Sequence, residues 1–268
     1  MKTKWVSAPY LVWMTVFIAV PLLMIAVFAF TANDGAFTIK NIQDVGQYAN
    51  IFFRSIWLSV IATAICLVVS YPVSFILSRM EKHKQATMLM IVMLPMWMNF
   101  LLRTYAWMTL LGNNGVINYL FGLIGLGPFK LINTSGAVVL GMVYNYLPFM
   151  ILPLYSVMVK IDKSVIEAAS DLGCSGISTL FRVIVPLSLP GITSGITMVF
   201  VPAISTFIIS RMLGGGSNLL IGDLIEMQFL GNAYNPHLGA AISLVLMVII
   251  LVIMTVMNQF SPDDQVLI

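Results

Sequence analysis

The sequence predicts an all-α, polytopic membrane protein with six transmembrane helices. Of its 268 residues, 60% are hydrophobic and only 9% are charged, whereas about one quarter of an ordinary soluble domain is charged. The hydrophobic residues fall into runs of about 20 residues or more, which is the length that crosses a bilayer as a helix. None of these runs shows the strict alternation of a barrel strand. A helix spans a membrane because it satisfies its own backbone hydrogen bonds.

Six such runs follow one another along the chain. The expected spans are Pro9–Phe30, Ile56–Leu77, Thr87–Leu111, Gly136–Val159, Leu187–Ser210 and Leu238–Met257. The first lies in an uncharged stretch from Trp5 to Asn33, which is longer than the apolar part of a cleaved signal peptide. A further half-helix over Leu219–Leu230 could return to the membrane surface. We expect residues 1–268 to form a single transmembrane domain.

The Lys and Arg residues predict the orientation, because positively charged loops stay in the cytoplasm. If the N-terminus is cytoplasmic, the residues inside are Lys2, Lys4, Arg79, Lys82, Lys84, Lys160, Lys163 and Arg182. Those outside are then Lys40, Arg54, Lys130 and Arg211, while Arg103 lies within a span. This distribution predicts a cytoplasmic location for both termini and for the loop between the fourth and fifth spans.

That loop, Ile161–Pro190, is the longest polar interruption on the cytoplasmic side. Ser164 and Glu167 have the spacing of a capping box, which starts a helix. Gly173 stands where a helix end favours a left-handed residue. The expected helix has about two to three turns, too few to cross a bilayer, so it should lie along the surface.

The same loop contains Glu167, Ala168 and Ala169, then Gly173, and after nine further residues the run Val183–Pro186. This pattern resembles the EAA loop of ABC-importer permeases, with valine in place of the family's Ile and Leu before the proline. The resemblance implies that this coupling helix docks on a cytoplasmic ATPase and transmits its motion. The residues it assigns to coupling are Ser164, Glu167, Ala168, Ala169, Asp171 and Gly173. A purely structural role for Glu167, as a helix cap, is the alternative.

Three further segments extend the resemblance over the whole chain. They are LPMWMNFLLRTYAWMTLLG at Leu94–Gly112, VPAISTFIISRMLGGGSNLLIGDLIEMQFL at Val201–Leu230 and NPHLGAAISL at Asn235–Leu244. They are similar to binding-protein-dependent ABC permeases, and closest to those of importers for the polyamines spermidine and putrescine. The resemblance implies a bacterial cytoplasmic membrane complex with a homologous second permease, two copies of a cytoplasmic ATPase and an external substrate-binding protein. An ABC permease for another small solute, such as an anion or organophosphonate, is the alternative, ahead of a secondary transporter or channel.

The chain has no pattern expected of an enzyme. It lacks the G-x-x-x-x-G-K-[ST] nucleotide motif, so ATP and Mg²⁺ are expected on the partner ATPase, and no cofactor is expected here. Its histidines, His83 and His237, have no neighbours that would form a metal site or an acid–base pair. A formal net charge of +3 is too small to indicate a nucleic-acid partner.

Seven residues are candidates for the translocation pathway. Arg103 either extends to the outer headgroups, or it faces a polar cavity or pairs with a carboxylate. Asp223 and Glu226 are the nearest acidic candidates and would share one face of a helix. They would receive the polyamine at the outer mouth or pair with an arginine there. The possible aromatic walls, which could equally form interface belts, are Tyr105, Trp107, Tyr144 and Phe207. Selectivity is then expected mainly in the external binding protein.

Overall fold

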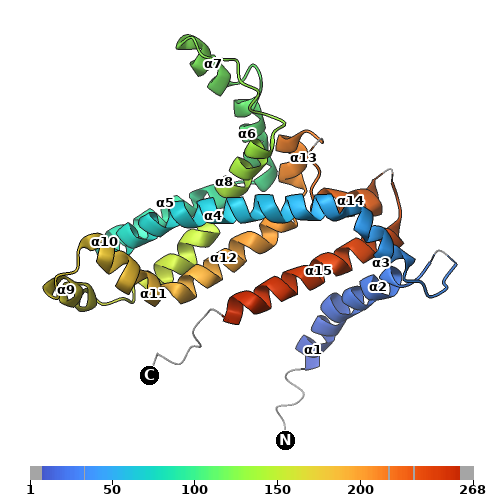
Figure 1. The fold of residues 1–268 in the computed structure, drawn as a ribbon, viewed down its shortest axis with the longest axis horizontal. Coiled ribbons are helices and arrows are strands. Elements are labelled where there is room, and N and C mark those ends of the chain that lie inside the picture. Colours follow the sequence, from blue (N-terminus) through green and yellow to red (C-terminus); the bar gives the residue numbers. More distant parts are fainter. Residues whose placement is uncertain (1–7, 33, 217, 232, 260–268) are drawn as a thin grey trace, which may run out of the picture.

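The computed structural model describes residues 8–32, 34–216, 218–231 and 233–259. Within these ranges the chain is helical, with one isolated antiparallel bridge between Thr31 and Phe37. The long helices lie along a common direction, and α6 and α7 project away from them (Figure 1). The predictions of the first span and of the orientation partly rest on residues outside the described ranges. These residues are Lys2, Lys4, Trp5 and Asn33.

The elements follow in chain order. The first half contains α1 Ala8–Met14, α2 Val20–Ala29, α3 Lys40–Val45, α4 Ala49–Arg79, α5 Lys82–Trp97, α6 Phe100–Leu111 and α7 Val116–Leu123. The second half contains α8 Ser135–Met158, α9 Lys163–Asp171, α10 Gly176–Thr179, α11 Val185–Leu187, α12 Leu189–Ile204, α13 Ile208–Gly214, α14 Ile221–Leu230 and α15 Pro236–Gln259. Shorter turns of π or 3₁₀ type are η2 Thr15–Ala19, η3 Gly46–Tyr48 and η4 Leu180–Ile184.

Four unbroken helical stretches of the described chain are long and apolar enough to cross a membrane. They are Pro9–Ala29, Lys40–Arg79, Ser135–Met158 and Pro236–Met257. Two bent helix pairs raise the number of spans to six when each pair is counted as one span. The predicted number and order of spans therefore agree with the structure, but two of the six are not single straight helices.

The third predicted span, Thr87–Leu111, is wrong as a continuous helix. The chain bends by 85° between α5 and α6, and Met98 and Asn99 have extended backbone conformations there. The Asn99 side chain accepts a hydrogen bond from the Leu101 amide at 2.8 Å and so caps the new helix. Hydropathy does not reveal the bend, because the residues on both sides of it are apolar.

The fifth predicted span, Leu187–Ser210, is also broken. Helices α11 and α12 meet at a 70° bend, where the buried Ser188 forms a 2.9 Å hydrogen bond with the Tyr71 hydroxyl of α4. Helix α12 ends at Ile204, and the chain leaves the helical conformation before α13 begins at Ile208. Ser210 is therefore in a separate short helix.

The core forms around α8, which packs against α4 and α12. Its buried side chains include Met142, Met150 and Leu154. Gly195 of α12 allows α12 to approach α8 closely, because a Cβ atom there would lie only 2.6 Å from the sulfur of Met150.

Helix α4 turns a stripe of small polar residues toward its neighbours. The buried members of that stripe are Ser55, Ser59, Thr63, Ser70 and Ser74. Small side chains at these positions let the membrane helices pack closely.

Candidate functional site

The polar loop after α8 contains the short surface helix that the sequence predicts, α9. It begins two residues earlier than the capping-box spacing implies: Asp162 is the N-cap, and Ser164 lies inside the first turn. No side chain caps this helix start. The predicted Ser164–Glu167 capping box is therefore wrong, since a capping serine must precede the first helical residue. The alternative interpretation, in which Glu167 acts only as a helix cap, depends on this capping box and therefore loses its support.

The other end of α9 is a Schellman motif, and Gly173 makes it possible. Gly173 has φ +81°, and its amide donates to the Ser170 carbonyl at 2.9 Å. The amide of Cys174 donates to the Ala169 carbonyl at 3.0 Å. These are the two hydrogen bonds that define the motif. No atom lies within 4 Å of a Cβ built on Gly173, so glycine is required by the backbone conformation and not by space.

Most of α9 is open to contact by another molecule. Ala169 is buried, whereas Glu167 and Ala168 are exposed. Leu172, the residue that follows α9, is 86% exposed. Ser164 and Asp171 are exposed as well. All six residues assigned to coupling therefore lie on one small helix and its C-terminal turn, at one end of the bundle (Figure 1).

Two polar contacts connect this end of the bundle to its long helices. The Arg79 guanidinium, at the end of α4, donates to the Ile161 carbonyl just before α9 at 2.9 Å. The Tyr155 hydroxyl of α8 donates to the Gln85 side chain of α5 at 3.0 Å. A displacement of α9 would therefore act directly on α4. In the sequence Arg79 is recognisable only as a cytoplasmic charge, because its partner is a backbone carbonyl.

Arg103 is in neither the headgroup position nor the carboxylate pair that the sequence suggests. It is only 7% exposed, so it does not extend to the headgroups, and no described carboxylate forms an ion pair with it. Its Nη1 donates to the Pro95 carbonyl at 2.6 Å. The guanidinium carbon lies 5.9 Å from the ring centres of Phe100 and Tyr144, within the range of cation–π attraction.

The aromatic candidates only partly come together around this arginine. Trp107 of α6 and Tyr144 of α8 form an edge-to-face pair with ring centres 5.3 Å apart. Tyr105 points into exposed surroundings, and Phe207, just before α13, is partly exposed. Trp107, Tyr144 and Arg103 therefore form one cluster at the contact of α6 with α8, and Tyr105 and Phe207 are not part of it.

The two acidic candidates have different environments, although both lie on α14. The Glu226 carboxylate forms a two-pronged ion pair with Arg211 of α13, in which the Nη1–Oε1 distance is 3.0 Å. Its side chain remains 22% exposed. Asp223 is 2% exposed and accepts the Leu220 amide at 2.9 Å in the first turn of α14. Asp223 is therefore buried, whereas the sequence predicts it at the outer mouth.

Helix α13 contacts both α6 and α14, so the Arg103 and Arg211 regions are neighbours.

Comparison with protein families gives a match over residues 1–263 to the binding-protein-dependent transport system inner membrane component family. The chain belongs to this family. It is thus a multi-pass membrane permease component of an ABC importer, as the EAA-like loop predicts. Members of this family act in transport across the inner membrane.

Relatives and solved structures agree with that assignment. The permease is 38% identical over 247 residues to the spermidine/putrescine transport system permease protein PotB of Haemophilus influenzae, covering 88% of this chain and 86% of the relative. PotB of Escherichia coli is 36% identical over the same length, with 88% and 90% coverage. A bacterial ABC transporter involved in alginate import has the same fold, with a TM-score of 0.82, 16% identity and coverage of 98% and 96%.

Proposed function

We propose that this permease forms half of the translocation pathway of an ATP-driven importer for spermidine and putrescine. The observation that carries the proposal is the 36–38% identity to PotB proteins over 88% of the chain. The alignment covers 88% of the chain, so it includes both the coupling helix and the Arg103 region.

The proposed ATPase contact is the α9 surface, in the cytoplasm together with both chain termini. Its support is physical: α9 exposes Glu167, Ala168 and Leu172, and Arg79 ties the preceding turn to a transmembrane helix. A docked ATPase would bury this surface and move α4 when it moves α9. Two copies of the ATPase, with ATP and Mg²⁺ bound to them, would serve this chain and a homologous second permease.

The proposed pathway must carry a flexible polycation past two arginines, and the structure shows how their charge is compensated. Arg211 is paired with Glu226, while Arg103 donates to a backbone carbonyl and lies 5.9 Å from the centres of two aromatic rings. The exposed part of Glu226 and the Trp107–Tyr144 pair are the groups that attract a cation. Since none of these groups distinguishes one polyamine from another, selectivity would come mainly from an external binding protein.

A substrate panel tests the proposal. The permease would be co-purified with its second permease and ATPase, and ATP hydrolysis measured with candidate binding proteins. Polyamine-loaded binding protein should stimulate hydrolysis, and the same protein without polyamine should not. Stimulation by an anion or organophosphonate, with no response to polyamines, would replace the polyamine assignment and leave the family assignment intact.

A further inference from the structure

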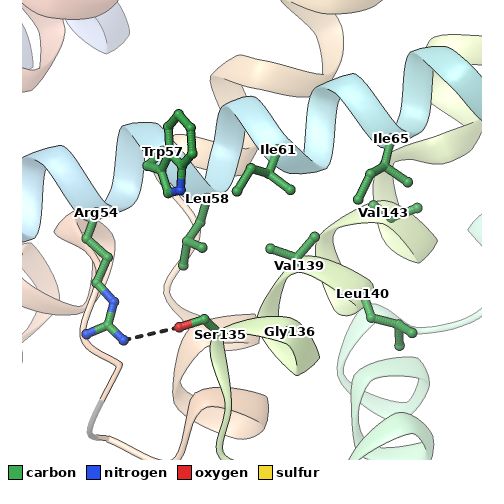
Figure 2. Close-up of a pocket in the computed structure, with 10 residues that line it drawn as sticks. All are labelled: Arg54, Trp57, Leu58, Ile61, Ile65, Ser135, Gly136, Val139, Leu140 and Val143. Carbon is green, nitrogen blue, oxygen red and sulfur yellow. Dashed lines mark hydrogen bonds between the residues drawn. The ribbon is translucent and has the colours of Figure 1, made fainter.

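A groove of about 740 Å³ lies between α4 and α8, apart from the Arg103 and Glu226 sites. Figure 2 shows Ile61 and Ile65 of α4 on one side of it and Val139, Leu140 and Val143 of α8 on the other. Both helices are membrane-crossing stretches. The groove therefore opens within the apolar layer, where its occupant would be a molecule compatible with lipid.

The groove is polar at one end only. There the Arg54 guanidinium donates to the Ser135 hydroxyl at 3.2 Å (Figure 2). Ser135 is the first residue of α8 and lies beside Asn218, whose side-chain oxygen is 3.3 Å from its hydroxyl. Helix α4 begins near this end, and its other end carries Arg79, which donates to the Ile161 carbonyl just before α9, so this end lies opposite α9. The exposed Trp57 adjoins it, and tryptophan is typical of the level where lipid headgroups meet the apolar layer.

We propose that this groove binds an anionic phospholipid. Its phosphate would bind Arg54 and Ser135, and one acyl chain would lie along Ile61, Ile65, Val139 and Val143. Guanidinium and hydroxyl donors suit phosphate oxygens, and the aliphatic wall suits a hydrocarbon chain. The arrangement does not suit a polyamine, because Arg54 has the same charge and the aliphatic wall offers no acceptors. The site is thus a place for a structural lipid between two helices of the core.

Native mass spectrometry of the full-length chain in a neutral detergent tests this assignment. Phosphatidylglycerol and phosphatidylcholine are added separately, and the retained lipid is counted. Wild type should retain phosphatidylglycerol more strongly. Arg54→Gln should lower that retention by roughly fivefold, the effect of one cation near a lipid surface, and leave phosphatidylcholine unchanged. Arg54→Lys should keep part of the preference, because it preserves charge but not the guanidinium geometry.

A second variant fills the groove and does not depend on Arg54. Leu140→Trp places an indole in the acyl-chain path and should lower retention of both lipids. Val252→Trp, at an exposed position of α15, is the matched control and should change neither. Equal phosphatidylglycerol retention in wild type and Arg54→Gln would overturn the headgroup assignment. Equal retention in both Trp variants would show that the groove is not a lipid site.

Discussion

Arg103 of α6 donates a hydrogen bond to the carbonyl oxygen of Pro95 in α5, across an 85° bend. Pro95 lies in the last turn of α5, where the helix dipole is negative, and its carbonyl also accepts the Met98 amide at 3.2 Å. The guanidinium therefore caps one helix from the next and holds the bend between them. This explains how a charged residue can be buried here without a carboxylate partner.

Replacing Arg103 should loosen this bend. Arg103→Gln retains a donor but loses the charge, and should destabilise the folded chain by roughly 1.5–3 kcal/mol, the range for hydrogen bonds to charged groups. Arg103→Lys should cost less, since it keeps the charge near the α5 end. Thermal unfolding of the detergent-solubilised protein measures both. An unchanged midpoint in Arg103→Gln would show that the Pro95 contact does not hold the bend.

Gly173 should be replaceable by asparagine but not by alanine. Its left-handed conformation costs alanine about 1–2 kcal/mol, whereas asparagine tolerates it. No neighbouring atom would collide with either side chain. Gly173→Ala should therefore reduce the ATPase that co-purifies with the permease, and Gly173→Asn should retain most of it. Equal recovery from the two variants would mean that the Schellman turn is not needed for docking.

The Arg211–Glu226 pair should affect transport more than stability. An exposed pair of this kind contributes about 0–1 kcal/mol, so Glu226→Gln should change the unfolding midpoint little but slow polyamine uptake. Asp223→Asn should do the reverse, because the buried Asp223 carboxylate accepts an amide at the start of α14. Uptake rate and thermal midpoint, measured together on both variants, separate the roles. If Asp223→Asn slowed uptake at full stability, the assignment would be reversed.

Labelling of single cysteines tests the proposed orientation. Cys66 and Cys174 are first replaced by serine, and cysteine is introduced at exposed positions. An impermeant maleimide added to intact cells should label Asn114→Cys and Tyr234→Cys, which lie on segments that we predict to be outside. His83→Cys and Ser178→Cys should react only after the cells are opened. Reaction of the last two in intact cells would mean that both termini and the α9 loop face outward.

The sequence predicts those features of the fold that depend on composition and on local backbone conformation. Hydropathy locates the spans, and Gly173 shows where α9 ends because a left-handed residue is nearly always Gly or Asn. The bends at Asn99 and Ser188 are missed, since apolar residues continue across them and hydropathy carries no direction. The Ser164–Glu167 capping box is wrong because its spacing does not establish where the helix starts.

The tertiary partners are harder to predict. Glu226 and Arg211 are on different helices, and only the packing of α13 on α14 makes them a pair. The partners of Arg103 and Arg79 are backbone carbonyls, which every residue has, so no side-chain pattern indicates them. The resemblance to ABC permeases predicts a role for α9, but not the Arg79 contact that connects the preceding turn to α4.

The most direct test of the account is uptake of labelled spermidine into proteoliposomes that contain the assembled importer. Wild type should accumulate spermidine only with ATP and the loaded binding protein present. Glu167→Ala in α9 should abolish that accumulation while the permease still inserts in the membrane. Uptake of spermidine without ATP, or wild-type uptake by a Glu167→Ala, Gly173→Asp double variant, would contradict an ATP-driven polyamine importer coupled through α9.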